Sequence, residues 1–360
     1  MTASLQPTYR PLAAGLTLLL AGATALAQGA APAAPRVAPL QVETADRAVA
    51  VWVLDRAGAF LTLPEVEADQ GWRITLAPAG CAVERIPAPA VWLDATARPP
   101  ALLAMLGRET PRAELLAQRL AGLVLARFGA SRRDAARGTA LLIARLRETA
   151  TAHLRLERTP GAGVRGELRL RPRPKTAFAQ LLSLLVPSST GAPALPDTDA
   201  ALWRLALDLD LAALGTARDE LVAGIALLAA DADVAEWKRA EFAERYGALL
   251  SGQCTLGWTP DRCVLALPPM DEVALETAAD ERAFRRWLTE LRRGVDVAEA
   301  RPGAGSVHLP AGAVLALHMK PVQIAATIPG AAAEPTALPS AVDVIVAAHP
   351  TELVCEVKIR

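Results

Sequence analysis

Alternation of apolar and charged residues is the feature that most constrains how this sequence can fold. Successive side chains of a β-strand point to opposite faces, so a period of two predicts strands with one buried face. Each alternating run is interrupted by a Pro-containing turn, and each such segment is therefore interpreted as a β-hairpin. The segments are HLRLERTPGAGVRGELRLRP from His153, CTLGWTPDRCVLALPP from Cys254 and VDVIVAAHPTELVCEVKI from Val342.

Amphipathic segments with helix caps separate these hairpins. Thr110 precedes Pro111, a residue favoured in the first turn of a helix, and Ser131 with Asp134 resembles a capping box. Hydrophobic residues make up 52% of the chain, which is ample for a core. Together the patterns predict an α+β fold of antiparallel hairpins and strands with long amphipathic helices packed on one face. The helices are expected over residues 110–129, 131–148, 233–250 and 280–294.

A strand followed by a short Ala-rich segment recurs along the chain. The copies are AVWVLDRAGAFLTL, WRLALDLDLAALGTA and LALHMKPVQIAATI, which align Asp55, Asp210 and Lys320 at the junction. Around the later copies the order hairpin, helix, loop and strand occurs twice. This order suggests degenerate internal repeats, longer than those of solenoid proteins.

The N-terminus has the pattern of a secretory signal peptide. Arg10 supplies a positive charge, an apolar stretch follows, and an Ala-Leu-Ala tripeptide ends at Ala27. We expect residues 1–27 to be a signal peptide, cleaved between Ala27 and Gln28, and the mature protein to be periplasmic or secreted. An uncleaved anchor is the alternative, but the apolar run is shorter than the roughly 20 residues that a membrane span needs. No transmembrane span is expected after cleavage.

Composition divides the remaining chain. Residues 28–39 are rich in Ala and Pro and are expected to form a disordered tether. Residues 40–360 are expected to form an α+β region of duplicated strand-helix-hairpin units. Pro-rich loops indicate sub-boundaries near 187–199 and 329–340.

The cysteines leave several disulfide patterns open. Cys81, Cys254, Cys263 and Cys355 could form two bridges in an extracytoplasmic protein. A turn at Pro260-Asp261 would place Cys263 opposite Trp258, so Cys254 would lie about 13 Å away along the ladder. A disulfide needs Cα atoms within about 7 Å. The alternatives are a Cys254–Cys263 bridge in a slipped register, buried thiols, and a bridge between hairpins or to Cys81.

Catalytic and metal-binding signatures are missing from the sequence. We find no G-x-S-x-G elbow, no phosphate-binding glycine loop, no C-x-x-C pair and no H-E-x-x-H motif. We therefore expect no metal and no cofactor. The catalytic candidates are His318 and the pair Asp208 and Asp210, whose spacing puts both carboxylates on one face of a strand. A solvated strand face is the simpler interpretation of that pair.

Basic residues are concentrated on the charged side of the first hairpin. Arg155, Arg165, Arg169 and Arg171 are the ligand-binding candidates. An anionic envelope polymer or a protein is the expected partner. Nucleic acid is not expected outside the cytoplasm, and this hairpin lacks aromatic residues that could stack bases. A charged outer face that resists edge pairing is the alternative.

These patterns favour an extracytoplasmic, non-catalytic binding or envelope-associated protein whose ligand the sequence does not identify. One alternative is a periplasmic hydrolase that uses residues of the exposed sheet face. Another is a carrier of an apolar ligand between helices and sheet.

Overall fold

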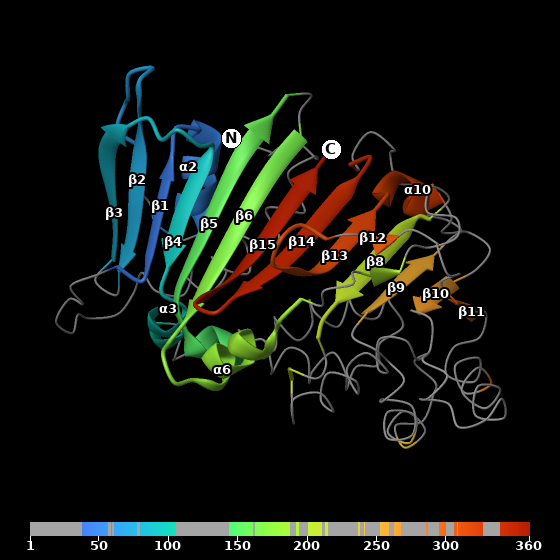
Figure 1. Ribbon diagram of the computed structural model, residues 1–360. Helices are drawn as coiled ribbons and strands as arrows, with labels where there is room; N and C mark the ends of the chain where they lie inside the picture. Colours follow the sequence, from blue (N-terminus) through green and yellow to red (C-terminus); the bar gives the residue numbers. More distant parts are fainter. Residues whose placement is uncertain are drawn as a thin grey trace.

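The computed structural model shows one wide sheet with a few short helices (Figure 1). The described residues are 38–56, 59, 61–77, 80–105, 144–160, 163–187, 192–193, 201–210, 213–214, 237, 241, 253–258, 263–267, 286, 295–299, 306–307, 309–326 and 339–360. The predicted signal peptide, and the predicted tether up to residue 37, lie outside these ranges.

Thirteen strands pair side by side in the order β11-β10-β9-β8-β13-β14-β15-β6-β5-β4-β1-β2-β3. Neighbouring strands are antiparallel, except that β10 and β11 run parallel. A separate two-stranded sheet contains β7 and β12. The strands are β1 (Leu40–Thr44), β2 (Gln70–Ala77), β3 (Gly80–Pro87), β4 (Leu93–Ala97), β5 (Thr149–Thr159), β6 (Gly163–Pro172), β7 (Ala192–Pro193), β8 (Trp203–Asp208), β9 (Gln253–Trp258), β10 (Cys263–Leu267), β11 (Val295–Glu299), β12 (Ser306–Val307), β13 (Ala313–Met319), β14 (Val342–His349) and β15 (Glu352–Ile359).

The C-terminal hairpin lies in the middle of the sheet. β14 pairs with β13 on one side, and β15 pairs with β6 on the other. Figure 1 shows these strands in red between the green pair β5 and β6 and the strands β13 and β8. The last two strands of the chain therefore join the strands that come early in the sequence to those that come late.

The three predicted hairpins are confirmed, and so is the register predicted for the second of them, β9 and β10. In β5 and β6, Leu154 lies opposite Leu168. In β9 and β10, Cys263 lies opposite Trp258. In β14 and β15, Val344 lies opposite Val357. Alternation and turn position together fix such a register, because a slip of one residue would move every apolar side chain to the other face.

The predicted α+β arrangement with long amphipathic helices packed on one face is wrong. The described fold is mostly antiparallel sheet, and its longest helix has 10 residues. All three hairpins belong to one continuous sheet, and in the described part of the chain no long helix packs on them. The described helices are α2 (Arg47–Arg56), α3 (Pro99–Met105), α6 (Ala177–Leu184) and α10 (Pro321–Ala326).

The helices predicted from capping signals lie largely outside the described residues. The segments 110–129, 233–250 and 280–294 contain only isolated described positions or none. The helix predicted over 131–148 is described in its last turn, residues 144–148. In the described part of the chain, no helix is long and apolar enough to span a membrane.

The first copy of the predicted repeat is a helix and not a strand. Alternation in AVWVLD is compatible with either structure, because short apolar runs do not distinguish them. Asp46 decides the outcome locally: its Oδ1 accepts hydrogen bonds from the amides of Ala48 at 2.8 Å and Val49 at 3.3 Å, which caps α2. The other copies do contain strands, β8 and β13, which pair with each other. The internal repeat as a whole stays a prediction.

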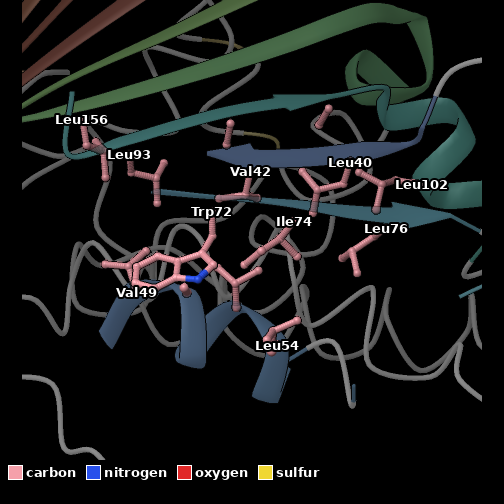
Figure 2. Packing of buried hydrophobic residues seen from close by; sticks show 14 of the residues in the cluster. Leu40, Val42, Val49, Leu54, Trp72, Ile74, Leu76, Leu93, Leu102 and Leu156 are labelled. Atoms are coloured by element: carbon pink, nitrogen blue, oxygen red, sulfur yellow. The ribbon is translucent and has the colours of Figure 1, made fainter. Parts of the chain in front are cut away.

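A core cluster of buried apolar residues lies between α2 and the strands β1, β2 and β4. Val42 and Ile74 are almost fully buried on the strands, and Ala50 and Val53 are buried on α2. Figure 2 shows Trp72 and Ile74 between the strands and the helix that carries Val49 and Leu54. This packing fixes the β1-β2-β3 edge of the sheet.

Candidate functional site

The charged face of the sheet carries a row of polar residues across β8, β13, β14 and β15. Arg204 lies opposite His318, His318 lies opposite Asp343, and Asp343 lies opposite Lys358. Directly opposed residues point to the same face, so these side chains are neighbours although β8 lies more than 100 residues before β13 in the sequence.

A second row runs beside the first, two residues further along each strand. It contains Ala206, Ala316, Ile345 and Glu356. Because the two alanines are small, they leave a hollow next to the larger side chains of the charged row. Leu309 and Pro310, which precede β13, also line this hollow. The resulting cavity, called the sheet groove below, has a volume of about 220 Å³.

His318 and Asp343 form the most closely coupled pair in the sheet groove. His318 Nδ1 lies 2.6 Å from Asp343 Oδ1, and the side chains are 26% and 25% exposed. Arg360 donates a second hydrogen bond to Asp343 Oδ2. Burial alone would raise the pKa of Asp343, but the hydrogen bonds from His318 and Arg360 outweigh it, and the pKa is lowered. Asp343 is therefore an ionised acceptor at neutral pH.

The tautomer of His318 follows from this charge state. An ionised carboxylate only accepts hydrogen bonds, so Nδ1 of His318 must carry the proton that it donates to Asp343. In the neutral ring, Nε2 is then an unprotonated acceptor. A histidine held in this way by a carboxylate has the arrangement of a general base and its orienting partner.

Two cations of the sheet groove have no carboxylate partner among the described residues. Glu356 is paired with Arg165, at 3.3 Å, and Asp343 with Arg360 and His318. No ion pair engages Arg204 or Lys358 within the part of the chain that the structure describes. The sheet groove therefore combines an apolar row with positive charge that its own carboxylates do not neutralise.

The two predicted catalytic carboxylates, Asp208 and Asp210, have different environments in the structure. Asp208 ends β8 and is only 5% exposed, so the expectation of a solvated face is wrong at this position. Its Oδ1 has no hydrogen-bond partner in the described structure. Asp210 lies beyond the strand and is exposed. Neither residue lines the sheet groove, and of the three catalytic candidates only His318 does so.

The four predicted ligand-binding arginines lie on the charged face, each beside a carboxylate. Arg155 is 3.1 Å from Glu157, and Arg165 pairs with Glu356. The remaining pairs are Arg169 with Glu167 at 2.6 Å, Arg169 with Glu352 at 3.4 Å and Arg171 with Glu352 at 3.0 Å. The structure thus places them in pairs of opposite charge, of which Arg165 with Glu356 reaches the sheet groove, and their role in ligand binding stays a prediction.

The described cysteines are free thiols. Cys81, Cys254 and Cys355 form no disulfide, and the side chain of Cys263 lies outside the described set. Burial raises the pKa of all three, and that of Cys254 to about 12. Of the patterns left open by the sequence, a Cys254–Cys263 bridge is contradicted, in agreement with the register in which Cys263 lies opposite Trp258. Within the described residues, no group of His, Cys, Asp and Glu could hold a metal ion.

Sequence reasoning did not identify Asp343 and Lys358 as site residues. Alternation in the third hairpin places both on the side opposite to the valines, which was a usable signal. What it could not supply was the strand order that sets Asp343 beside His318.

No family model matches this chain, and no curated protein or solved structure is significantly similar to it. The sheet groove is therefore the basis for the function proposed below.

Proposed function

We propose that this protein is an extracytoplasmic, non-catalytic binding protein whose sheet groove holds a small anion with an apolar part. The observation that carries the proposal is the position of Arg204 and Lys358, two cations without a carboxylate partner in the described structure, beside the row of Ala206, Ala316 and Ile345. Ligand sites generally combine apolar walls with a few polar groups that fix orientation.

The charge balance of the sheet groove favours an anion over a cation. Each carboxylate that lines it already receives hydrogen bonds from an arginine, so a cationic ligand would have to displace one of them. An anion would instead supply a missing partner to Arg204. Charge-assisted hydrogen bonds of this kind contribute about 1.5 to 3 kcal/mol each.

The volume of the sheet groove limits the ligand to a small group. Its volume of about 220 Å³ is below the roughly 300 to 1,000 Å³ of typical ligand pockets. A headgroup with a chain of a few carbon atoms fits this space. A polymer could place only one terminal or side group in it.

The test is a calorimetric titration with hexanoate, hexyl phosphate, hexylamine and hexanol. We expect the anions to bind and the amine and the alcohol not to bind. Arg204→Gln and Lys358→Gln should each weaken anion binding about tenfold or more. Arg85→Gln makes the same change of charge on exposed β3, at the sheet edge, and is the matched control. Absence of anion binding, or equal loss in the control, would contradict the proposal.

A hydrolase is the second candidate, because His318 and Asp343 have the geometry of a base and its orienting partner. The residues that line the sheet groove include no Ser, Thr, Cys or Tyr in the described structure, so the nucleophile would have to be water. Turnover of short-chain esters that disappears in His318→Gln would favour this candidate. Turnover that is absent, or unchanged in His318→Gln, would leave the binding protein as the better account.

A further inference from the structure

His318 lies between charged groups from every described strand packed against it. Arg204 on β8 is opposite it on one side, and Asp343 on β14 is opposite it on the other. Beyond Asp343 lie Lys358 and Arg360, and Glu356 lines the same sheet groove. Lys320, two residues along its own chain, follows the end of β13. Among the described residues that precede β13, Leu309 and Pro310 line the sheet groove.

This arrangement determines in which protonation state His318 can donate a hydrogen bond to a bound anion. Nδ1 is committed to Asp343, so an anion next to Arg204 can interact with the imidazole only through Nε2. In the neutral ring Nε2 carries a lone pair, which repels a negatively charged oxygen. When the ring carries a proton on both nitrogens, Nε2 becomes a donor and can hydrogen-bond to a negatively charged oxygen.

We propose that the sheet groove binds a short aliphatic monocarboxylate together with one proton, which is held between Nε2 of His318 and the bound carboxylate. The inference rests on the proposed anion-binding function and adds a ligand class and a pH dependence. The headgroup lies against Arg204 and His318, and the chain lies over Ala206, Ala316 and Ile345.

The charges around the sheet groove favour a monoanion over a dianion. Asp343 and Glu356 line the same space and repel a second negative charge. A phosphate monoester carries about −1.5 to −2 at neutral pH, whereas a carboxylate carries a single charge and fits the guanidinium fork of Arg204.

The proton balance of the binding step is simple. The free protein with neutral His318 and the free carboxylate anion combine with one proton taken from solvent, and no covalent bond forms or breaks. Whether the proton resides on Nε2 or on the ligand oxygen, the complex contains one proton more than its separated components. Mass action then requires the affinity for the anion to rise as pH falls, by up to about tenfold per pH unit.

The experiment is a calorimetric titration of the full chain with hexanoate between about pH 5.5 and 8.5, where carboxylic acids are ionised. At each pH it is repeated in two buffers with different enthalpies of ionisation, which gives the number of protons taken up. We expect uptake approaching one proton at the alkaline end and tighter binding towards acid. Hexanoate should bind at least tenfold more tightly than hexyl phosphate.

Two variants separate His318 from histidines in general. His318→Gln retains a side chain that can donate to Asp343 but cannot titrate, so its affinity should be weak and independent of pH. His153→Gln is the matched control, because His153 Nε2 is also paired with a carboxylate, Asp94 Oδ1 at 2.7 Å, but does not line the sheet groove. The control should keep the pH dependence of the unaltered protein.

The outcomes distinguish this inference from the proposed function. Hexanoate binding that takes up no proton and is unchanged in His318→Gln overturns the inference and leaves the proposed function intact. Absence of hexanoate and hexyl phosphate binding at every pH overturns both.

A further arm identifies the source of the carboxylate. The peptide acetyl-Ala-Ala-Leu is compared with hexanoate and with the amidated peptide. Tighter binding of the free-acid peptide assigns the ligand to a polypeptide terminus, and tighter binding of hexanoate assigns it to a free acid. Equal binding of the amide and the acid overturns the inference.

Discussion

Trp92 Nε1 donates a hydrogen bond to Asp46 Oδ2 at 2.9 Å, across 46 residues of sequence. Arg158 donates to the same oxygen at 2.5 Å, and its guanidinium lies 4.8 Å from the centre of the Trp92 ring. Asp46 also caps α2 through its other oxygen. One carboxylate thus connects the start of α2, the segment before β4 and the end of β5.

Replacing Asp46 with Ala should therefore destabilise the β1-β2-β4 end of the sheet. Loss of the helix cap costs about 1 kcal/mol, and loss of the hydrogen bond from Trp92 Nε1 costs about 1 kcal/mol more. We expect the free energy of unfolding in urea to fall by about 2 kcal/mol. Asp55→Ala, an exposed change near the other end of α2, should have no comparable effect. Equal losses in the two variants would show that Asp46 does not connect these elements.

Gly163 begins β6 in a space that leaves no room for a side chain. A Cβ atom there would lie 2.5 Å from Thr159 Oγ1 and 2.8 Å from the carbonyl oxygen of Ile359. The threonine can rotate, but the backbone of β15 cannot move without disturbing the ladder. Gly163→Ala should lower the free energy of unfolding by about 1 to 3 kcal/mol.

Gly166 provides the comparison on the same strand. A Cβ atom at this position would meet Leu156 Cδ2 at 3.0 Å, which is the flexible end of a side chain. Alanine also restricts the unfolded chain relative to glycine, which offsets part of the cost. Gly166→Ala should change stability by less than about 1 kcal/mol in urea unfolding. A larger loss for Gly166→Ala than for Gly163→Ala would contradict this explanation.

Asp343 should contribute a pH-dependent part of the stability. Its pKa is lower in the folded protein than in the unfolded chain. Its contribution is therefore complete above the unfolded pKa of about 3.9, and it is lost as pH falls through the folded pKa. At pH 7, Asp343→Asn should be less stable by about 1 to 2 kcal/mol. The difference between the two proteins should close as pH falls below about 4.

Denaturant unfolding of the unaltered protein and Asp343→Asn over this pH range measures the difference. Glu84→Gln is the control, because Glu84 is 62% exposed and its ion pair with Arg73, at 3.6 Å, lies far from the sheet groove. Exposed pairs of this kind contribute little, so this variant should match the unaltered protein throughout. A constant difference between Asp343→Asn and the unaltered protein at every pH would contradict the assigned role.

The hairpins could be predicted because their information is local. Alternation identified the two faces of each strand, and a Pro-containing turn fixed which residues lie opposite each other, as with Cys263 and Trp258. The apolar run at Val49–Val53 lacked such a turn, and its conformation was decided by the capping carboxylate of Asp46. Periodicity alone could not distinguish these outcomes.

The site could be predicted only in part because its geometry is non-local. His318 was a candidate from the sequence, but its partner Asp343 is defined by the pairing of β13 with β14. Burial of Asp208 likewise could not be read from its own strand, because β8 is packed by other segments, β7 and β9 among them. An alternating pattern predicts which face of the strand a side chain occupies, but it does not predict which other segments cover that face.

Cys254 should be unreactive while the protein is folded. Burial raises its pKa to about 12, so almost none of the nucleophilic thiolate is present at pH 8. We expect iodoacetamide to modify Cys254 slowly in the native protein and rapidly in urea, as followed by peptide mass spectrometry. Cys81 on edge strand β3 is the internal comparison and should react faster. A peptide with Cys254 in a disulfide would contradict the description of a free thiol.

The predicted signal peptide has a direct biochemical test. When the full chain is expressed in a bacterium with a periplasm, the mature protein should begin at Gln28 and be recovered from the periplasm or the medium. Ala27→Asp places a charge at the cleavage position, where a small residue is required, and should leave the longer chain uncut. Ala30→Asp makes the same change beyond the site and should be processed normally. N-terminal peptide mass spectrometry of the cell fractions distinguishes the products. A protein that stays in the cytoplasm and retains residues 1–27 would contradict the predicted signal peptide and the extracytoplasmic location. Anion binding in the sheet groove is tested separately, by the titrations described above.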